Sequence, residues 1–243
     1  MFDYFNVNYT GNPFQLFGIP HLVTLLVVIV GLLLLLRWLK TLSTEGKKRF
    51  RYILAATLVV CEIIWQVLFA IKGQWSVKIH LPLHLCAVMA YLSAAMLITR
   101  NKRLYEFIYF PGMCGAIQAV FTPSLENFGF PHFLYFQTFI IHGAIILAAL
   151  YMTIVEKYRP RPASFIRVII GMNIYMLIIG GVNRLLGSNY MFIAHKPDFP
   201  SLLDVLGPWP LYILSLEAVG LFAFFLVYLP FLIIDLRKST TEK

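Results

Sequence analysis

Seven long apolar runs limit the fold of this chain more than any other feature of its sequence. A helix needs about 20 consecutive apolar residues to cross a bilayer, and its backbone polar groups must be satisfied within the segment itself. We therefore predict an all-α membrane protein, a bundle of seven transmembrane helices that forms one polytopic membrane domain over residues 1–243. The predicted helices cover residues 17–38, 50–71, 79–98, 104–121, 133–155, 165–183 and 210–236.

The composition agrees with this class and excludes others. Hydrophobic residues make up 60% of the chain and charged residues 13%, and the mean hydropathy is +0.78. The net charge of +9 does not indicate nucleic acid as a partner, because the basic residues lie at the ends of apolar runs without interleaved aromatic residues. The start, Met1 to Tyr4, lacks the basic region of a signal peptide, so the first run should remain as a membrane helix.

The basic residues also predict the orientation in the cell membrane. Four of the 20 Lys and Arg residues lie on the side expected for the N-terminus, and the other sixteen lie on the opposite side. The four are Lys72, Lys78, Arg184 and Lys196. Because Lys and Arg accumulate in cytoplasmic loops, we expect the N-terminus outside and the C-terminus in the cytoplasm.

Two prolines indicate local features of the predicted helices. Pro82 is expected in the first turn of the third helix, where a missing N–H is tolerated. Pro111 and Gly112 fall inside the fourth run and should kink that helix or open its hydrogen-bond ladder.

Polar side chains concentrate in the outer half of the predicted bundle. A rise of about 1.5 Å per residue gives the depth of each one. The outer-half residues are Glu62, Gln66, His84, Cys86, Gln118, Gln137, His142, Asn183 and Glu217. Polar groups inside a membrane are costly and usually functional, so we expect a shared cavity that opens toward the outer leaflet.

Two histidines and a cysteine are the first candidates for chemistry. His80 is predicted to be an exposed interfacial residue, whereas His84 is either a pocket residue or a packing histidine whose hydrogen bonds are satisfied. Cys86 is either a nucleophile, favoured by its place near a helix N-terminus, or a small buried hydrophobe. The spacing of His80 and His84 lacks the Glu of a zinc motif and a third ligand, so no metal site is expected.

His142 is the sharpest single candidate, because its imidazole lies well inside an apolar helix. It is interpreted as a general acid or base, with a hydrogen bond to a neighbouring backbone as the alternative. Glu62 and Glu217 need a partner or a proton when buried, and they either bind substrate or join helices. The same two interpretations, substrate binding and hydrogen bonding between helices, apply to the amides of Gln66, Gln118, Gln137 and Asn183.

Several phrases in the sequence resemble the bacterial YwaF-type family of integral membrane proteins. They are His80-Leu-Pro-Leu-His-Leu-Cys86, Phe130-Pro-His-Phe133 with His142-Gly143, Asn189-Tyr-Met-Phe192 with Lys196-Pro197, and Ser201-Leu-Leu-Asp204 with Gly207-Pro-Trp-Pro-Leu-Tyr212. More distantly, the chain is similar to the eukaryotic transmembrane protein 164 group, described as acyltransferases that move a fatty acyl chain onto lysophospholipids through a cysteine and a histidine. The resemblance implies roles for His84 and His142. Leu83 stands at the position of that group's cysteine, and a thiol follows three residues later at Cys86.

Two functional hypotheses follow. The first is a membrane-embedded lipid acyltransferase or acyl hydrolase, in which Cys86 attacks an acyl ester, His142 moves the proton, and His84 or a nearby amide stabilises the oxyanion. The second is a non-catalytic binder or transporter of a small molecule or lipid, with Glu62 and Glu217 as counter-charges or proton sites. Both take membrane lipids as partners, with a phospholipid or fatty-acyl substrate for the enzyme, and neither needs a cofactor. The sequence leaves the oligomeric state open.

Overall fold

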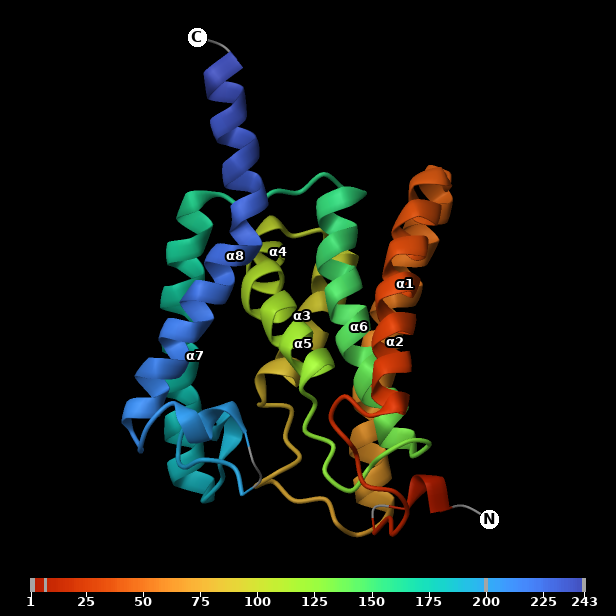
Figure 1. Cartoon of the computed structure of the whole chain (residues 1–243), viewed down its shortest axis with the longest axis vertical. Helices are drawn as coiled ribbons and strands as arrows, with labels where there is room; N and C mark the ends of the chain where they lie inside the picture. The colour runs from red at the N-terminus through yellow and green to blue at the C-terminus, as the bar shows by residue number, and fades with distance from the viewer. Residues whose placement is uncertain (1–2, 7, 199–200, 242–243) are drawn as a thin grey trace.

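The computed structural model describes residues 3–6, 8–198 and 201–241, and these residues form helices and connecting loops without any strand (Figure 1). The α-helices are α1 (Ile19–Thr41), α2 (Thr44–Ile71), α3 (Leu85–Thr99), α4 (Lys102–Phe107), α5 (Met113–Phe121), α6 (Phe133–Ile154), α7 (Pro162–Leu186) and α8 (Leu211–Thr241). A π-helical turn, η2 (Ile108–Gly112), joins α4 to α5. The short 3-10 helices are η1 (Asp3–Phe5), η3 (Tyr190–Phe192) and η4 (Leu202–Val205).

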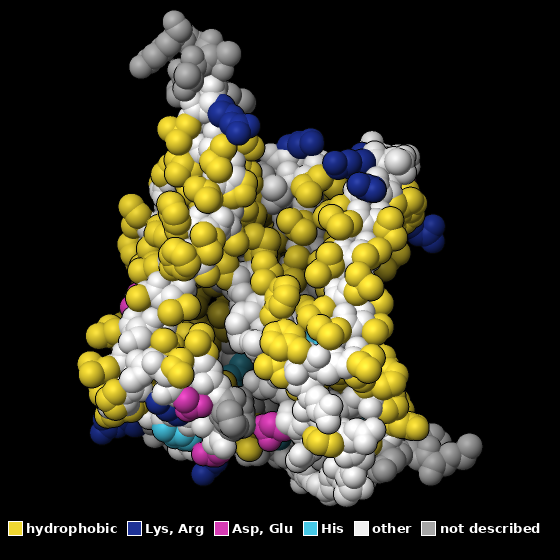
Figure 2. Space-filling model, viewed as in Figure 1, with side chains coloured by type: hydrophobic (Ala, Val, Ile, Leu, Met, Phe, Trp, Pro, Cys, Tyr) yellow, Lys and Arg dark blue, Asp and Glu magenta, His cyan; other side chains and the backbone are white. Residues whose placement is uncertain are grey.

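Five of these helices are long and apolar enough to cross a membrane: α1, α2, α6, α7 and α8. Of the other two predicted spans, α3 is a shorter apolar helix, and the run that contains α4 and α5 is divided by η2. The described ends of the chain lie at opposite ends of the bundle (Figure 1). Lys and Arg side chains gather mostly at the end where α8 finishes (Figure 2). The count of seven spans and the orientation in the cell remain predictions.

Helix α6 is the central column of the bundle. It packs against α1, α2, α3, α5 and η2, and 61% of its apolar window is buried, compared with 22% for α2 and 6% for α8. Small residues such as Ala144, Ala148 and Ala149 let these neighbours approach it closely. Helices α7 and α8 stand to one side (Figure 1) and contact the rest of the bundle chiefly through α4, η2 and α5.

The fourth run contains the irregularity predicted from Pro111 and Gly112. Both residues lie in η2, where the backbone widens to a π-helical turn before α5 continues. Proline has no N–H to donate and its ring clashes with the preceding turn, so the α-helical ladder cannot pass through it unchanged.

The third helix begins later than predicted. It starts at Leu85 with His84 as its N-cap, so Pro82 lies in the preceding loop and the prediction of a helix from residue 79 was wrong. Its 15 residues span about 22 Å, which is less than the roughly 30 Å of a hydrocarbon core. The part of this column before Leu85 is therefore irregular chain, whose backbone groups need partners from elsewhere in the protein.

Helices α4 and α7 approach closely at Gly171, where a Cβ atom would lie 2.4 Å from Cζ of Phe107. We expect Gly171→Ala to lower the unfolding temperature, because overpacking costs about 1–3 kcal/mol. Gly181→Ala in the same helix is the matched control, since an added Cβ there meets nothing within 4 Å. Thermal unfolding in detergent measures both, and equal unfolding temperatures for the two variants would contradict a tight contact.

Candidate functional site

Glu62, Cys86 and His142 come together from three helices that pack against one another, α2, α3 and α6. Glu62 precedes the last residue of α2, Ile71, by nine positions, and His142 follows the first residue of α6, Phe133, by nine positions. Both therefore lie about 14 Å inside the same end of the bundle. The Glu62 carboxylate interacts electrostatically with His142 and is within electrostatic range of Cys86 and Tyr91.

The hydrogen bonds of His142 determine which ring nitrogen is free. Its Nδ1 lies 2.7 Å from the carbonyl oxygen of Thr138, and a carbonyl can only accept, so Nδ1 carries the proton. Nε2 is then the atom with a lone pair. It has no hydrogen-bond partner among the described residues, and it is not one of their fully enclosed unpartnered atoms. The basic nitrogen is therefore unpaired and not fully enclosed by the protein.

The carboxylate of Glu62 is likewise unpaired and not fully enclosed by the protein. Glu62 is only 7% exposed, and its oxygens form no hydrogen bond or ion pair with other described residues. Neither oxygen is among the fully enclosed unpartnered atoms of the described chain, which belong to Arg51 and Ser93. Figure 2 shows a hollow between the column of α8 and the column of α1, with a histidine side chain visible inside it. We expect Glu62 and His142 to line a recess between the helices, because neither side chain has an unpartnered polar atom that is fully enclosed.

The start of α3 presents backbone donors beside Cys86. His84 caps the helix without a side-chain bond, and the first N–H with a backbone acceptor is that of Val88, which donates to the His84 carbonyl at 3.2 Å. Within the described chain, the N–H groups of Leu85, Cys86 and Ala87 have no acceptor. Free N–H groups and the positive end of the helix dipole favour negative charge.

His84 belongs to a second group, closer to the loops. Its ring contacts Tyr190 and Phe192, with centroids 5.2 and 5.4 Å away, and its Nδ1 accepts the Met191 N–H at 3.4 Å. The remaining proton on its ring is therefore on Nε2. None of these contacts joins His84 to His142.

Asn183 holds the segment that covers His84. Its amide donates to the Tyr190 carbonyl at 2.9 Å, and its carbonyl accepts from the Tyr190 N–H at 2.8 Å and from the Ser188 hydroxyl at 2.9 Å. The Tyr190 hydroxyl in turn accepts the Leu81 N–H and donates to the Val77 carbonyl. The buried amide thus makes three hydrogen bonds within the protein.

The other predicted polar residues are also engaged locally. Gln66 donates to the His80 carbonyl at 2.5 Å and accepts from the Trp75 indole. Gln137 is buried, and its amide lies 3.4 Å from the Cys61 carbonyl. Gln118 is exposed and bonds to Thr122 within its own helix region. Glu217 joins α8 to α7 by accepting from Asn173 at 2.7 Å.

His80 differs from its prediction as an exposed residue, since only 5% of it is exposed. Its ring packs against Phe69 and Trp65, and its Nδ1 accepts the Ser76 N–H at 3.1 Å. The tight turn from residue 76 to residue 80 directs the imidazole into the protein interior, where it is buried. Sequence spacing gave no sign of this turn.

Burial lowers the pKa of His80 below its ordinary value, because the imidazolium loses its hydration. Protonation therefore opposes folding: the stability is fully present above the ordinary pKa of about 6.5 and is lost as the pH falls below it. We expect the unfolding temperature to fall between about pH 7 and pH 5. His80→Asn, whose Oδ1 keeps the acceptor for Ser76, should flatten this fall. A pH profile that the substitution leaves unchanged would assign the acid sensitivity to other groups.

Sequence reasoning missed a partly buried ionic cluster at the other end of the bundle. Glu156 pairs with Arg100 and lies 3.9 Å from the buried Arg51, and the Tyr151 hydroxyl donates to it. These residues stand far apart in the sequence, so no local motif indicates them. Among the described residues, no group of three His, Cys, Asp or Glu side chains is placed to hold a metal ion.

The fold defines a class, a helical multi-pass membrane protein, and its candidate site combines a half-buried thiol and imidazole with a buried carboxylate. The chain belongs to the TMEM164 family, whose model matches residues 16–228. No curated protein and no solved structure matches the chain.

Proposed function

We propose that the chain is a membrane-embedded enzyme of lipid acyl transfer or acyl hydrolysis, with seven spans and its N-terminus outside the cell membrane. The observation that carries the proposal is the place of Cys86, next to unpaired N–H groups at the start of α3 and within electrostatic range of Glu62, which also interacts with His142. A nucleophile, a base, a group that stabilises the charged base, and oxyanion donors are the parts that acyl transfer requires.

The first half of the reaction forms a thioester. Nε2 of His142 takes the thiol proton of Cys86, directly or through one water, and the sulfur attacks the carbonyl carbon of a lipid ester. The N–H groups of residues 85–87 receive the developing oxyanion, and Nε2–H of His84 is a further donor. When the C–O bond breaks, His142 gives its proton to the leaving lysolipid oxygen.

The second half returns the enzyme to its starting state. An alcohol of a second lipid, or water, gives its proton to His142 and attacks the thioester. The C–S bond breaks, and the thiolate is protonated by His142. Glu62 stabilises the imidazolium that forms in both halves, as the carboxylate of a catalytic triad does.

The depth of the recess suits a phospholipid ester. The group lies about 14 Å inside the helix ends, and α7 and α8, which contact the rest of the bundle chiefly through α4, η2 and α5, leave a path from the membrane. Acyl chains can then remain against apolar side chains while the ester reaches Cys86.

The test compares two half-buried thiols, Cys86 and Cys114. The purified protein in lipid is treated with an acyl-phosphonate or thiol-directed probe, and lipid products are measured in parallel. We expect Cys86→Ala to lose labelling and turnover and Cys114→Ala to keep both. Labelling that persists in Cys86→Ala, together with no lipid turnover in the unmodified protein, would overturn the proposal.

A proton-coupled binder or transporter is the second candidate, favoured by the unpartnered carboxylate of Glu62. In this function Glu62 and His142 exchange a proton as ligand moves, and Glu217 holds α7 to α8 through Asn173. Uptake into vesicles driven by a pH gradient, and lost in Glu62→Gln, would support it. Gradient-independent uptake would count against it.

A further inference from the structure

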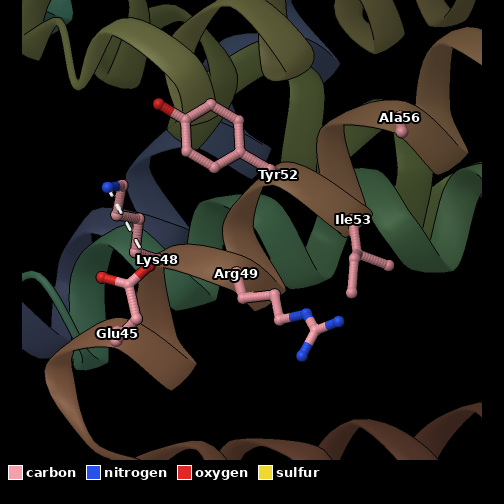
Figure 3. Close-up of a pocket in the computed structure, with 6 residues that line it drawn as sticks. All are labelled: Glu45, Lys48, Arg49, Tyr52, Ile53 and Ala56. Atoms are coloured by element: carbon pink, nitrogen blue, oxygen red, sulfur yellow. Dashed lines mark ion pairs between the residues drawn. The ribbon is translucent and has the colours of Figure 1, made fainter.

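A shallow groove of about 560 Å³ runs along the surface of α2 near its N-terminus (Figure 3). It is lined by Glu45, Lys48, Arg49, Tyr52, Ile53 and Ala56. Figure 3 shows Lys48 and Tyr52 on one side of the helix and Arg49 and Ile53 on the other. The groove therefore follows the helix axis between two rows of side chains spaced four residues apart.

The chemistry of the groove changes along its length. The charged residues lie in the first two turns of α2, and Ile53 and Ala56 follow toward the apolar middle of the helix. Tyr52 stands at the transition, where amphipathic rings are typical of the membrane interface. From residue 45 to residue 56 the groove extends for about 16 Å. Charge at one end and apolar surface at the other match a headgroup followed by an acyl chain.

The charged residues of the groove give it a net positive charge. Lys48 lies 3.9 Å from Glu45 in an exposed pair, with 55% and 81% of the two side chains accessible, so this pair is weak. The guanidinium of Arg49 has no partner among the described residues. Arg51 does not contribute, because it is buried on the inner face near Glu156. One positive charge thus remains unmatched at the mouth of the groove.

We propose that this groove binds a glycerophospholipid whose headgroup carries a net negative charge. Its phosphate lies at Arg49, while Lys48 adds attraction from the opposite side of the helix, and one acyl chain follows Ile53 and Ala56 into the hydrocarbon layer. Glu45 repels a second negative charge on the headgroup and weakens the hold of Lys48 on the phosphate. The site lies on the outward face of α2 and does not depend on the proposed chemistry at Cys86.

The experiment titrates the full chain, purified in a neutral detergent, with phosphatidylglycerol or with phosphatidylcholine. Native mass spectrometry counts the lipids retained. One basic side chain near a membrane surface contributes about fivefold to the affinity for anionic lipid. We expect a preference for phosphatidylglycerol that falls roughly fivefold for each charge removed in Lys48→Gln and Arg49→Gln.

A matched variant removes the same charge elsewhere. Arg103→Gln with Lys157→Gln also lowers the net charge by two, at exposed residues outside α2, and should keep the preference. Glu45→Gln should strengthen phosphatidylglycerol binding, so the site is testable even if the double variant at Lys48 and Arg49 does not fold.

Two results would overturn the proposal. One is an equal loss of preference in the control variant, which would assign the effect to overall charge. The other is equal binding of both lipids by the unmodified chain, which would leave the groove without selectivity for anionic headgroups.

Discussion

Replacing His142 with alanine should lower kcat for lipid acyl transfer by about 10²- to 10⁴-fold. The imidazole presents its lone pair on Nε2 to the recess because Nδ1–H is held by Thr138, and no other histidine interacts with Glu62 in the described chain. Without this base, the Cys86 thiol keeps its proton and the leaving oxygen receives none. Product formation from a labelled phospholipid, at saturating concentration, measures the loss.

His195→Ala is the matched control, because His195 is exposed in the loop after η3 and contacts neither Glu62 nor Cys86. It should retain full kcat. An acyl transfer rate in His142→Ala within a few-fold of the unmodified protein would remove His142 from the mechanism. Glu62 and Cys86 would then need another proton acceptor.

Replacing Asn183 with leucine should destabilise the fold by about 3 kcal/mol, the largest loss expected from a residue outside the recess. The change leaves the N–H and carbonyl of Tyr190 and the hydroxyl of Ser188 without their partner, and each buried polar group left unpaired costs about 1 kcal/mol or more. Unfolding in SDS, followed by tryptophan fluorescence, measures the free energy.

Gln118→Leu serves as the comparison for this variant. Gln118 is exposed, and its bonds reach only Thr122, so its replacement should change the unfolding free energy by less than about 0.5 kcal/mol. If both variants unfold alike, the buried amide does not hold the loop that covers His84.

Much of the helical pattern could be predicted from the sequence, because apolar length and composition decide which segments can cross a bilayer. The ends of α6 differ from the prediction by a single residue, and the break at Pro111 appears where proline chemistry requires it. The start of α3 could not be predicted. Its backbone before Leu85 is satisfied by hydroxyl groups of Tyr175 and Tyr190, which lie about a hundred residues further along the chain.

The candidate site, like the fold, could be predicted only in part from the sequence. Equal depth for Glu62 and His142 follows from counting residues along two helices, and the structure places them within electrostatic range of each other. Depth alone does not reveal whether an amide already has partners. Gln66 and Asn183 sit where a ligand could meet them, yet their hydrogen bonds are used by Trp75, His80 and Tyr190.

The brevity of α3 has a consequence for how the chain assembles during synthesis. An ordinary span can settle in the bilayer as soon as it leaves the translocon, since its ladder is complete within itself. Here the acceptor of the Leu81 N–H is the hydroxyl of Tyr190, a residue that is translated 109 positions later. Insertion of the third segment must therefore remain provisional until the loop that precedes the last helix has emerged.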